Sequence, residues 1–196
     1  VYYGDLMQLI PVDDTNRVFH VIDIFPQELV DRLLALDWNN MNWDVQNAQE
    51  MWARRSLNRD EYPVLREASD YIAKLQPVLA EQLGLQFKWD TNIGNTNWWV
   101  DQPGFWVPMH TDGELPMSLQ LFWVGQPNLA TSFHNFGQEK NYRAQFEFKP
   151  NTGYMMLNGP NDDGSQPLNW HAMLNPVPEG TYRVTSYTVF PKYSHK

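Results

Sequence analysis

The motif His110-Thr111-Asp112 limits what this chain can be more than any other feature. It closes an aromatic segment, residues 105–111, whose composition is typical of a β-strand. Because successive side chains of a strand alternate between faces, His110 and Asp112 should point the same way about 7 Å apart along the chain, close enough to hold one metal ion. A His-x-Asp pattern alone is weak, since short motifs recur by chance without a function. The motif therefore needs a third ligand from elsewhere in the sequence.

The composition narrows the kind of site and partner. There is no cysteine, so a metal would be held by histidine and by carboxylate or carbonyl oxygen. With 14 basic and 23 acidic residues the net charge is −9, which disfavours a nucleic-acid partner. No apolar run approaches the roughly 20 residues that span a bilayer. The 196 residues fit one domain, and we expect a soluble, cytoplasmic protein without a membrane partner.

The first part of the chain, residues 1–84, has the pattern of helices. Residues 26–38 carry apolar side chains at helical spacing, with Pro26 near the first turn. A second helical pattern covers residues 62–83 and should end at Gly84. Pro77 lies inside it, which predicts a kink or two shorter helices. We expect these helices to support a second part of the chain, residues 85–196.

Short aromatic and β-branched segments, separated by Gly, Pro and Asn, make up residues 85–196. The predicted strands are residues 86–88, 97–101, 105–111, 117–124, 145–148, 153–157, 169–174 and 182–190. About eight short strands without intervening helices favour an antiparallel sandwich or jelly roll, preceded by the N-terminal helices. The polar loop 158–167 precedes His171, and a loop in that place is expected to cover a site and to be mobile.

The third metal ligand has two main candidates, His171 and His134. His20 and His195 lie near the chain ends, outside the predicted strand core. A lone histidine among apolar neighbours is more often a packed core residue than a ligand. We favour His171 because a turn and the last predicted strand follow it directly. Two histidines and one carboxylate on one side of a metal leave positions open, which suits ferrous iron in oxygen-activating enzymes.

Arg183 and Thr185 begin the last predicted strand and share one of its faces. An arginine donates two parallel hydrogen bonds to a carboxylate, and a neighbouring hydroxyl can donate a third. The alternative is a surface arginine paired with an acidic residue, which is the more common situation. The position of Arg183 after His171 favours the carboxylate site.

Several short motifs follow one another in order through the second half of the chain. They are Gly104, His110-Thr111-Asp112, residues 118–123, residues 130–133, residues 150–153, His171, Pro176-Val177, Gly180 and Arg183. Over residues 95–190 this order resembles the 2-oxoglutarate- and Fe(II)-dependent oxygenases, in particular their prolyl-hydroxylase-like branch. The resemblance implies a double-stranded β-helix in which His110, Asp112 and His171 bind iron.

The same resemblance implies the cosubstrate and the reaction. Arg183, with Thr185, would bind the distal carboxylate of 2-oxoglutarate, whose keto acid end chelates the metal. The enzyme would be a hydroxylase that releases succinate and CO2, with ascorbate as a candidate reductant. Its substrate would be a small molecule or a peptidyl residue.

The chain departs from that branch at several positions. Asp101 stands where the branch often has tyrosine, and Leu129-Ala130 replaces a Gly-Gly pair. Arg183 stands where lysine is frequent, and the spacer from His171 to Pro176-Val177 is one residue longer. These differences leave the cofactor prediction unchanged and bear on the substrate.

Three further residues are candidates from strand position alone. Trp106 shares the predicted site face with His110 and could form a substrate wall, although most tryptophans of such a domain are core residues. Phe105, Val107 and Met109 would form the opposite, packing face. Asn97 and Gln120 could hydrogen-bond the cosubstrate or orient a ligand.

Three other functions are compatible with parts of this pattern. A non-catalytic jelly-roll binding module would use the histidines structurally. A nucleobase-oxidising member of the same superfamily is disfavoured by the acidic charge. A zinc hydrolase would use the same ligands but leaves Arg183 and Thr185 without a role.

Overall fold

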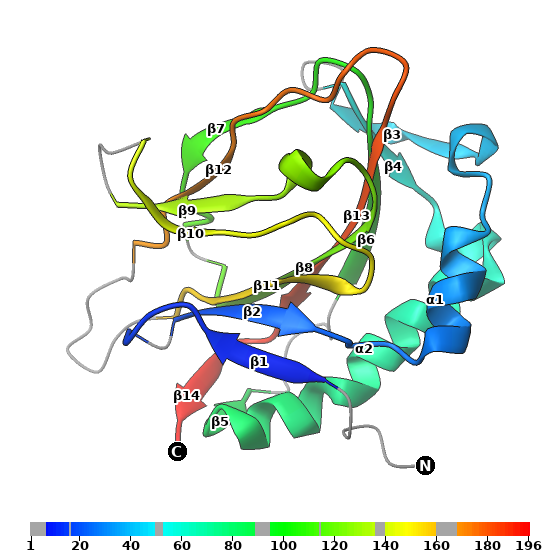
Figure 1. The fold of residues 1–196 in the computed structure, drawn as a ribbon. Coiled ribbons are helices and arrows are strands. Elements are labelled where there is room, and N and C mark those ends of the chain that lie inside the picture. The colour runs from blue at the N-terminus through cyan, green and yellow to red at the C-terminus, as the bar shows by residue number, and fades with distance from the viewer. Residues whose placement is uncertain are drawn as a thin grey trace.

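A computed structural model of the chain describes residues 7–15, 17–49, 53–88, 95–113, 115–135, 140–159 and 168–196, with the backbone alone at 43–49 and 95. Two antiparallel sheets face each other, and two helices lie on the outer side of the larger one (Figure 1). The predicted jelly roll is confirmed: the chain is mostly antiparallel β with two α-helices in its described part.

The larger sheet has eight strands in the described residues. Their order across the sheet is β1 (Gln8–Pro11), β2 (Val18–Ile22), β11 (Thr152–Leu157), β8 (Met117–Val124), β13 (Arg183–Phe190), β6 (Asn95–Asp101), β4 (Arg54–Leu57) and β3 (Trp43–Gln49). The smaller sheet has the order β10 (Tyr142–Gln145), β9 (Ser132–His134), β12 (His171–Met173) and β7 (Val107–His110). A two-stranded pair, β14 (Tyr193–His195) with β5 (Leu85–Phe87), lies apart from both.

The helices form where the apolar spacing predicts them. In α1 (Gln27–Leu34) the residues Leu29, Val30 and Leu33 are buried against the core. The second helix, α2 (Pro63–Gln82), begins with Pro63 in its first turn, where the missing N–H is not needed. The described residues include three short 3-10 turns, η1 (Trp38–Asn40), η3 (Arg59–Glu61) and η4 (Pro127–Leu129). No helix among the described residues is long and apolar enough to cross a membrane.

Pro77 does not divide α2 into two helices. The helix continues through it to Gln82, because losing one backbone hydrogen bond is offset when a buried apolar face holds the helix on a core. The predicted end is confirmed, since Gly84 has a φ of 63° just past the C-terminal cap. Of the two alternatives predicted for Pro77, two shorter helices are wrong and a kink stays a prediction, while the predicted stop is right.

Residues 1–84 contribute more than helices. β1 and β2 form one edge of the large sheet, and β4 and β3 form the other. The prediction that this part only supplies helical support is corrected on that point, because short polar strands such as β4 (Arg54–Leu57) lack a clear period-2 pattern. This correction matters for function, because β4 pairs with β6 beside the candidate site described below.

The predicted strands of the second part all have counterparts, most of them with shifted bounds. Residues 117–124 coincide with β8, whereas the predicted strand 145–148 overlaps β10 only at Gln145. The strands that were not predicted are β1, β2, β3, β4, β9 and β14. Most of the predicted loop 158–167, namely residues 160–167, lies outside the described residues, so its role as a cover stays a prediction.

The core has two layers. One lies between the helices and the large sheet, where Trp98 and Trp123 are fully buried with ring centroids 5.7 Å apart. Their indole N–H groups donate to Ser69 and Ser186, at 3.2 and 3.0 Å. The second layer lies between the two sheets and includes Phe122 and Phe133. Burial of each such phenylalanine contributes about 1.5–3 kcal/mol, which holds the two sheets together around the site.

Candidate metal centre

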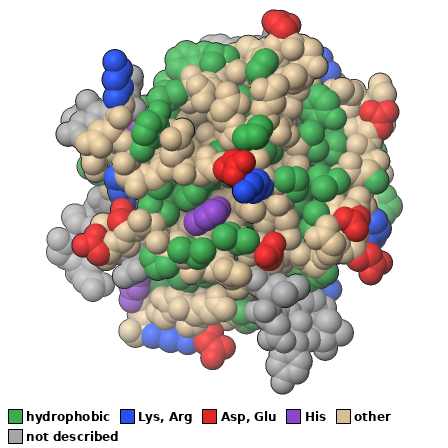
Figure 2. All heavy atoms as spheres, in the orientation of Figure 1, with side chains coloured by type: hydrophobic (Ala, Val, Ile, Leu, Met, Phe, Trp, Pro, Cys, Tyr) green, Lys and Arg blue, Asp and Glu red, His purple; other side chains and the backbone are tan. Residues whose placement is uncertain are grey.

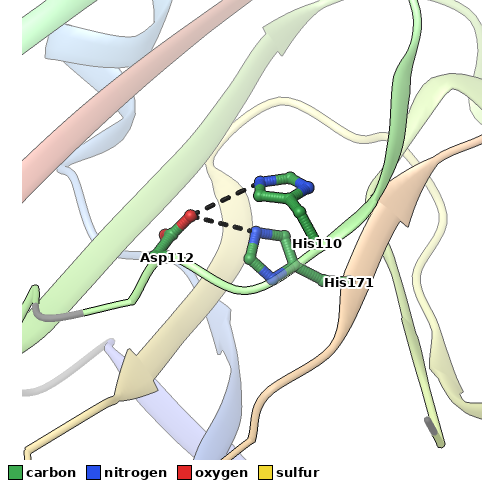
Figure 3. A group of neighbouring side chains, drawn as sticks. All are labelled: His110, Asp112 and His171. Atoms are coloured by element: carbon green, nitrogen blue, oxygen red, sulfur yellow. Dashed lines mark ion pairs between the residues drawn. The ribbon is translucent and has the colours of Figure 1, made fainter.

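His110, Asp112 and His171 lie together at one end of the space between the sheets. His110 ends β7, His171 begins β12, and these strands pair so that the two histidines lie opposite each other. Asp112 follows two residues after the end of β7. One ligand atom from each residue lies within 4.8 Å of the others (Figure 3). The structure therefore brings together the three residues that the sequence predicts.

A single carboxylate oxygen faces both imidazoles. Oδ1 of Asp112 lies 3.5 Å from Nε2 of His110 and 3.4 Å from Nε2 of His171 (Figure 3). Two imidazole nitrogens and one carboxylate oxygen thus converge on a common point. This donor set suits zinc or a divalent transition metal with open coordination positions.

The atoms that do not converge are held by other protein groups. Nδ1 of His110 bonds to the carbonyl oxygen of Pro108, and Nδ1 of His171 bonds to that of Asn169, both at 2.8 Å. Because a carbonyl oxygen only accepts, Nδ1 of each ring carries a proton, and in the neutral ring the Nε2 lone pair is then available to a metal. The hydroxyl of Tyr187 donates to Oδ2 of Asp112 at 2.5 Å. Every candidate ligand is therefore oriented by a second contact, which is how metal ligands are commonly fixed.

The local electrostatics favour a cation at this point. Burial opposes ionisation of Asp112, but hydrogen bonds with His110 and His171 outweigh it and hold its pKa well below the ordinary value. Burial likewise opposes protonation of His110, yet the hydrogen bonds to Asp112 and Pro108 raise its pKa overall. Burial, aided by the charge of Asp112, raises the pKa of Tyr187, so its hydroxyl stays a donor. Asp112 therefore stays ionised at neutral pH.

The three side chains differ in how far solvent reaches them. The side chains of His171 and Asp112 are 5% and 12% exposed, whereas that of His110 is 39% exposed. The centre is thus closed by protein on one side and open beside His110. An open side is needed for a reactant to approach a metal held here.

A cavity of about 210 Å³ extends from the metal centre into the space between the sheets. It is lined by Arg54, Trp99, Val107, His110, Asp112, Leu115, Gln120, Thr131, Tyr154, His171, Ala172, Met173, Arg183 and Tyr187. The lining combines the three candidate ligands with two arginines and several polar side chains. It can therefore hold a small anion next to a bound metal.

Arg183 is a fully buried part of this lining, at the start of β13. Its Nε lies 2.9 Å from Oδ2 of Asp101, and its Nη1 donates to the carbonyl oxygen of Leu129 at 2.9 Å. Nη1 also contacts the sulfur of Met173. Burial lowers the pKa of Arg183 while Asp101 opposes that shift, and a guanidinium stays charged in either case. Its buried Nε has no hydrogen-bond partner among the described residues.

The other predicted cosubstrate residues are placed differently. Gln120 lines the cavity, and its side-chain oxygen accepts a hydrogen bond from Thr131 at 3.0 Å. Thr185 is fully buried between Arg183 and Tyr187 on β13 but is not part of the cavity lining. Its Oγ1 has no hydrogen-bond partner in the described part of the chain. Asn97 is exposed on β6 and is not in the lining.

Trp106 is 47% exposed and is absent from the cavity lining, whereas Val107 is part of it. The sequence predicted that Val107 lies on the packing face of its strand, and this is wrong because Val107 lines the cavity. The pairing of β7 with β12 shifts register between His171 and Met173, and this irregularity breaks the strict alternation of faces. Trp106 as a substrate wall stays a prediction.

The remaining histidines lie outside the cluster. His134 is buried on β9, where its Nε2 bonds to Oγ of Ser132 at 2.8 Å, so it is not gathered with the other ligands. His20 lies on β2 and stacks on Phe146. His195 is exposed on β14.

Three residues of the site had no functional role in the sequence-based prediction. Tyr187 continues the alternation Arg183, Thr185, Tyr187, so extending that rule by one step would have found it. Tyr154, on β11, is buried in the lining, and burial raises its pKa. Arg54 comes from β4, a strand that the sequence did not indicate.

The chain matches no protein-family model and no curated protein. Solved structures share its fold. The prolyl-4-hydroxylase of Pseudomonas putida aligns with a TM-score of 0.59 and 16% identity, over 93% of this chain and 97% of that one. The viral collagen prolyl hydroxylase of Paramecium Bursaria Chlorella virus-1 aligns at 0.52 and 14%, over 90% of each chain.

A third similar structure is HygX from Streptomyces hygroscopicus, solved with nickel and 2-oxoglutarate bound. It aligns with a TM-score of 0.53 and 8% identity, over 89% of this chain and 82% of that one. The chain therefore has the fold of the 2-oxoglutarate- and Fe(II)-dependent oxygenases, which confirms the resemblance in its sequence at the level of fold. Within that fold it carries a His-Asp-His cluster able to hold a metal ion.

Proposed function

We propose that this protein is a 2-oxoglutarate- and Fe(II)-dependent dioxygenase that hydroxylates a small molecule or a peptidyl residue. The observation that carries the proposal is the convergence of two Nε2 atoms and one carboxylate oxygen, each oriented by a second protein contact. His110, Asp112 and His171 would hold the iron. Two histidines and a carboxylate leave open positions, as non-haem Fe(II) oxygenases require.

Arg183 is the proposed anchor for the distal carboxylate of 2-oxoglutarate. It lies in the same cavity as the metal centre, and its buried Nε has no hydrogen-bond partner in the described part of the chain. Thr185 lies on the same strand and its hydroxyl has no hydrogen-bond partner in the described residues, so we propose it as a second donor although it does not line the cavity. Gln120 would add a polar contact from β8.

Iron and 2-oxoglutarate, when bound, supply the oxidising chemistry: O2 is consumed, the cosubstrate becomes succinate and CO2, and one oxygen atom is inserted into a substrate C–H bond. The protein's own contribution is positional. Asp112 keeps its negative charge at neutral pH, because hydrogen bonds hold its pKa low. Tyr187 fixes which carboxylate oxygen faces the metal, and the sheets exclude water around Arg183.

The substrate would approach beside His110, the exposed member of the cluster. Two comparisons support a small-molecule or peptidyl substrate: prolyl hydroxylases share the fold, and HygX has been solved with hygromycin B bound. On the face seen in Figure 2, lysine and arginine side chains are scattered among acidic and uncharged ones. That distribution, with the net charge of −9, does not favour a nucleic-acid substrate.

Turnover separates this proposal from a non-catalytic binding module. Purified protein is incubated with Fe(II), ascorbate, 2-oxoglutarate and air, with and without candidate substrates, and succinate is measured. An oxygenase forms succinate only when iron and 2-oxoglutarate are both present, and faster with its substrate. A binding module forms none in any combination.

A further inference from the structure

Arg54, Asp101 and Arg183 form one row across three neighbouring strands. The register pairs Asp101 of β6 with Arg54 of β4 on one side and with Arg183 of β13 on the other. All three side chains are largely or fully buried, at 14%, 0% and 1% exposure. Two guanidinium groups that line the cavity thus share a single buried carboxylate.

Asp101 is held mainly by Arg54. Nε of Arg54 donates to Oδ1 at 2.6 Å, and its Nη2 donates to Oδ2 at 3.1 Å, which is a two-point contact. Nε of Arg183 lies 2.9 Å from Oδ2 but is not aligned for a hydrogen bond. A two-point arginine contact is the stronger and more directional of the two. Asp101 therefore makes its two-point contact with Arg54 and keeps one ion-pair contact with Arg183.

Arg54 is fixed in this position by aromatic rings. Its guanidinium carbon lies 4.0 Å from the centroid of Trp99 and 4.3 Å from that of Phe105. Cations placed over aromatic faces are attracted by the ring electrons, and most strongly when water is excluded. Arg54 therefore keeps a defined orientation.

The charge count at this end of the cavity is positive. Two arginines and one aspartate leave one excess positive charge (2 − 1 = 1), buried where water cannot screen it. Without Arg54, Asp101 would neutralise Arg183, and an incoming carboxylate would meet a neutral pair that includes another carboxylate. Arg54 thus decides whether this end of the cavity attracts or rejects an anion.

We propose that Arg54 is a positioning residue for cosubstrate binding: it binds Asp101 and so leaves Arg183 available for the distal carboxylate of 2-oxoglutarate. This inference rests on the proposed function. It also gives β4, which precedes the jelly-roll core in the sequence, a defined part in the site.

Calorimetric titration with 2-oxoglutarate, in the presence of Mn(II) and without oxygen, tests the inference. The proteins compared are the wild type, Arg54→Met, Asp101→Asn and the double variant. Arg54→Met should weaken 2-oxoglutarate binding at least tenfold, because Asp101 then engages Arg183. The double variant should bind within threefold of the wild type, because the competing carboxylate is gone. Titration with Mn(II) alone should give the same affinity, within threefold, for all four proteins.

A purely structural role for Arg54 gives a different pattern. The inference is overturned if Arg54→Met binds 2-oxoglutarate within threefold of the wild type, or if the double variant binds no better than Arg54→Met. It is equally overturned if Mn(II) affinity falls in parallel, since the whole site is then disturbed. If Arg54→Met does not fold, Arg54→Gln replaces it, and the same weakening of 2-oxoglutarate binding is expected. Failure of the wild type to bind 2-oxoglutarate with Mn(II) present would instead overturn the proposed function, and this inference with it.

Discussion

His110 and His171 lie opposite each other in the pairing of β7 with β12, and their ring centroids are 4.3 Å apart. Antiparallel pairing thus turns two residues far apart in the sequence into adjacent ligands. Asp112 completes the set because it follows β7 by two residues. The position of these three side chains is a property of the backbone register.

Removal of a ligand should remove the metal. We predict that His110→Ala and Asp112→Ala each lose bound Fe(II) or Mn(II) after dialysis and form no succinate, because two remaining donors hold a divalent ion too weakly. Metal content and succinate are measured on the same samples. His195→Ala is the matched control, because this exposed histidine on β14 lies outside the cluster. Full metal content in either ligand variant would exclude these residues.

The hydroxyl of Tyr187 should strengthen metal binding without touching the metal. Tyr187→Phe removes the donor to Oδ2 of Asp112, and partners of this kind typically change metal affinity by about 10- to 100-fold. We expect a loss of that size in a Mn(II) titration, with unchanged circular dichroism. Tyr193→Phe is the control, because its hydroxyl accepts a hydrogen bond from Gly159 away from the cavity. Equal affinities in the two variants would argue against the orienting role.

Substitution of Arg183 should weaken the binding of 2-oxoglutarate and leave the binding of the metal unchanged. Breaking a buried charge pair is worth about 3–5 kcal/mol, so Arg183→Met should raise the 2-oxoglutarate concentration for half-maximal succinate formation by about 100-fold or more. Its Mn(II) affinity should match that of the wild type. Arg143→Met is the control, since Arg143 pairs with Asp13 and does not line the cavity. An unchanged requirement for 2-oxoglutarate in the Arg183 variant would contradict the proposal that Arg183 binds its distal carboxylate.

Gly153 is required by the close approach of β11 to β8. A Cβ at this position would lie 1.9 Å from the carbonyl oxygen of Gln120, a contact with backbone that cannot move aside. We expect Gly153→Ala to destabilise the protein by about 3 kcal/mol or more in urea unfolding, because overpacking against backbone displaces β8. Gly180→Ala, at a φ of 72° with open space around it, should lose only about 1 kcal/mol. Similar losses in the two variants would contradict this explanation.

The sequence carried enough information for the metal ligands and for Arg183, because each lies in or beside a strand whose composition is distinctive. Strand alternation placed His110 and Asp112 together, and the order of motifs singled out His171 over His134. The predicted strand 117–124 has the observed bounds of β8. The structure buries every residue of this strand from Met117 to Trp123. Local pattern and side-chain chemistry agree in these places.

What the sequence did not reveal depends on pairing between distant segments. Arg54 reaches the cavity only because β4 pairs with β6, and nothing in residues 54–57 indicates that strand. Val107 joins the lining because the register of β7 shifts, which strict alternation cannot anticipate. Pro77 stays inside α2, because packing outweighs its local preference.

The most direct measurement is a calorimetric titration of the wild-type protein with 2-oxoglutarate, with and without Mn(II) and in the absence of oxygen. If His110, Asp112, His171 and Arg183 together bind the metal and the cosubstrate, 2-oxoglutarate should bind at least tenfold more tightly when the metal is present. Asp112→Ala should lose that difference. Binding of equal strength with and without Mn(II), or no binding at all, would contradict the account.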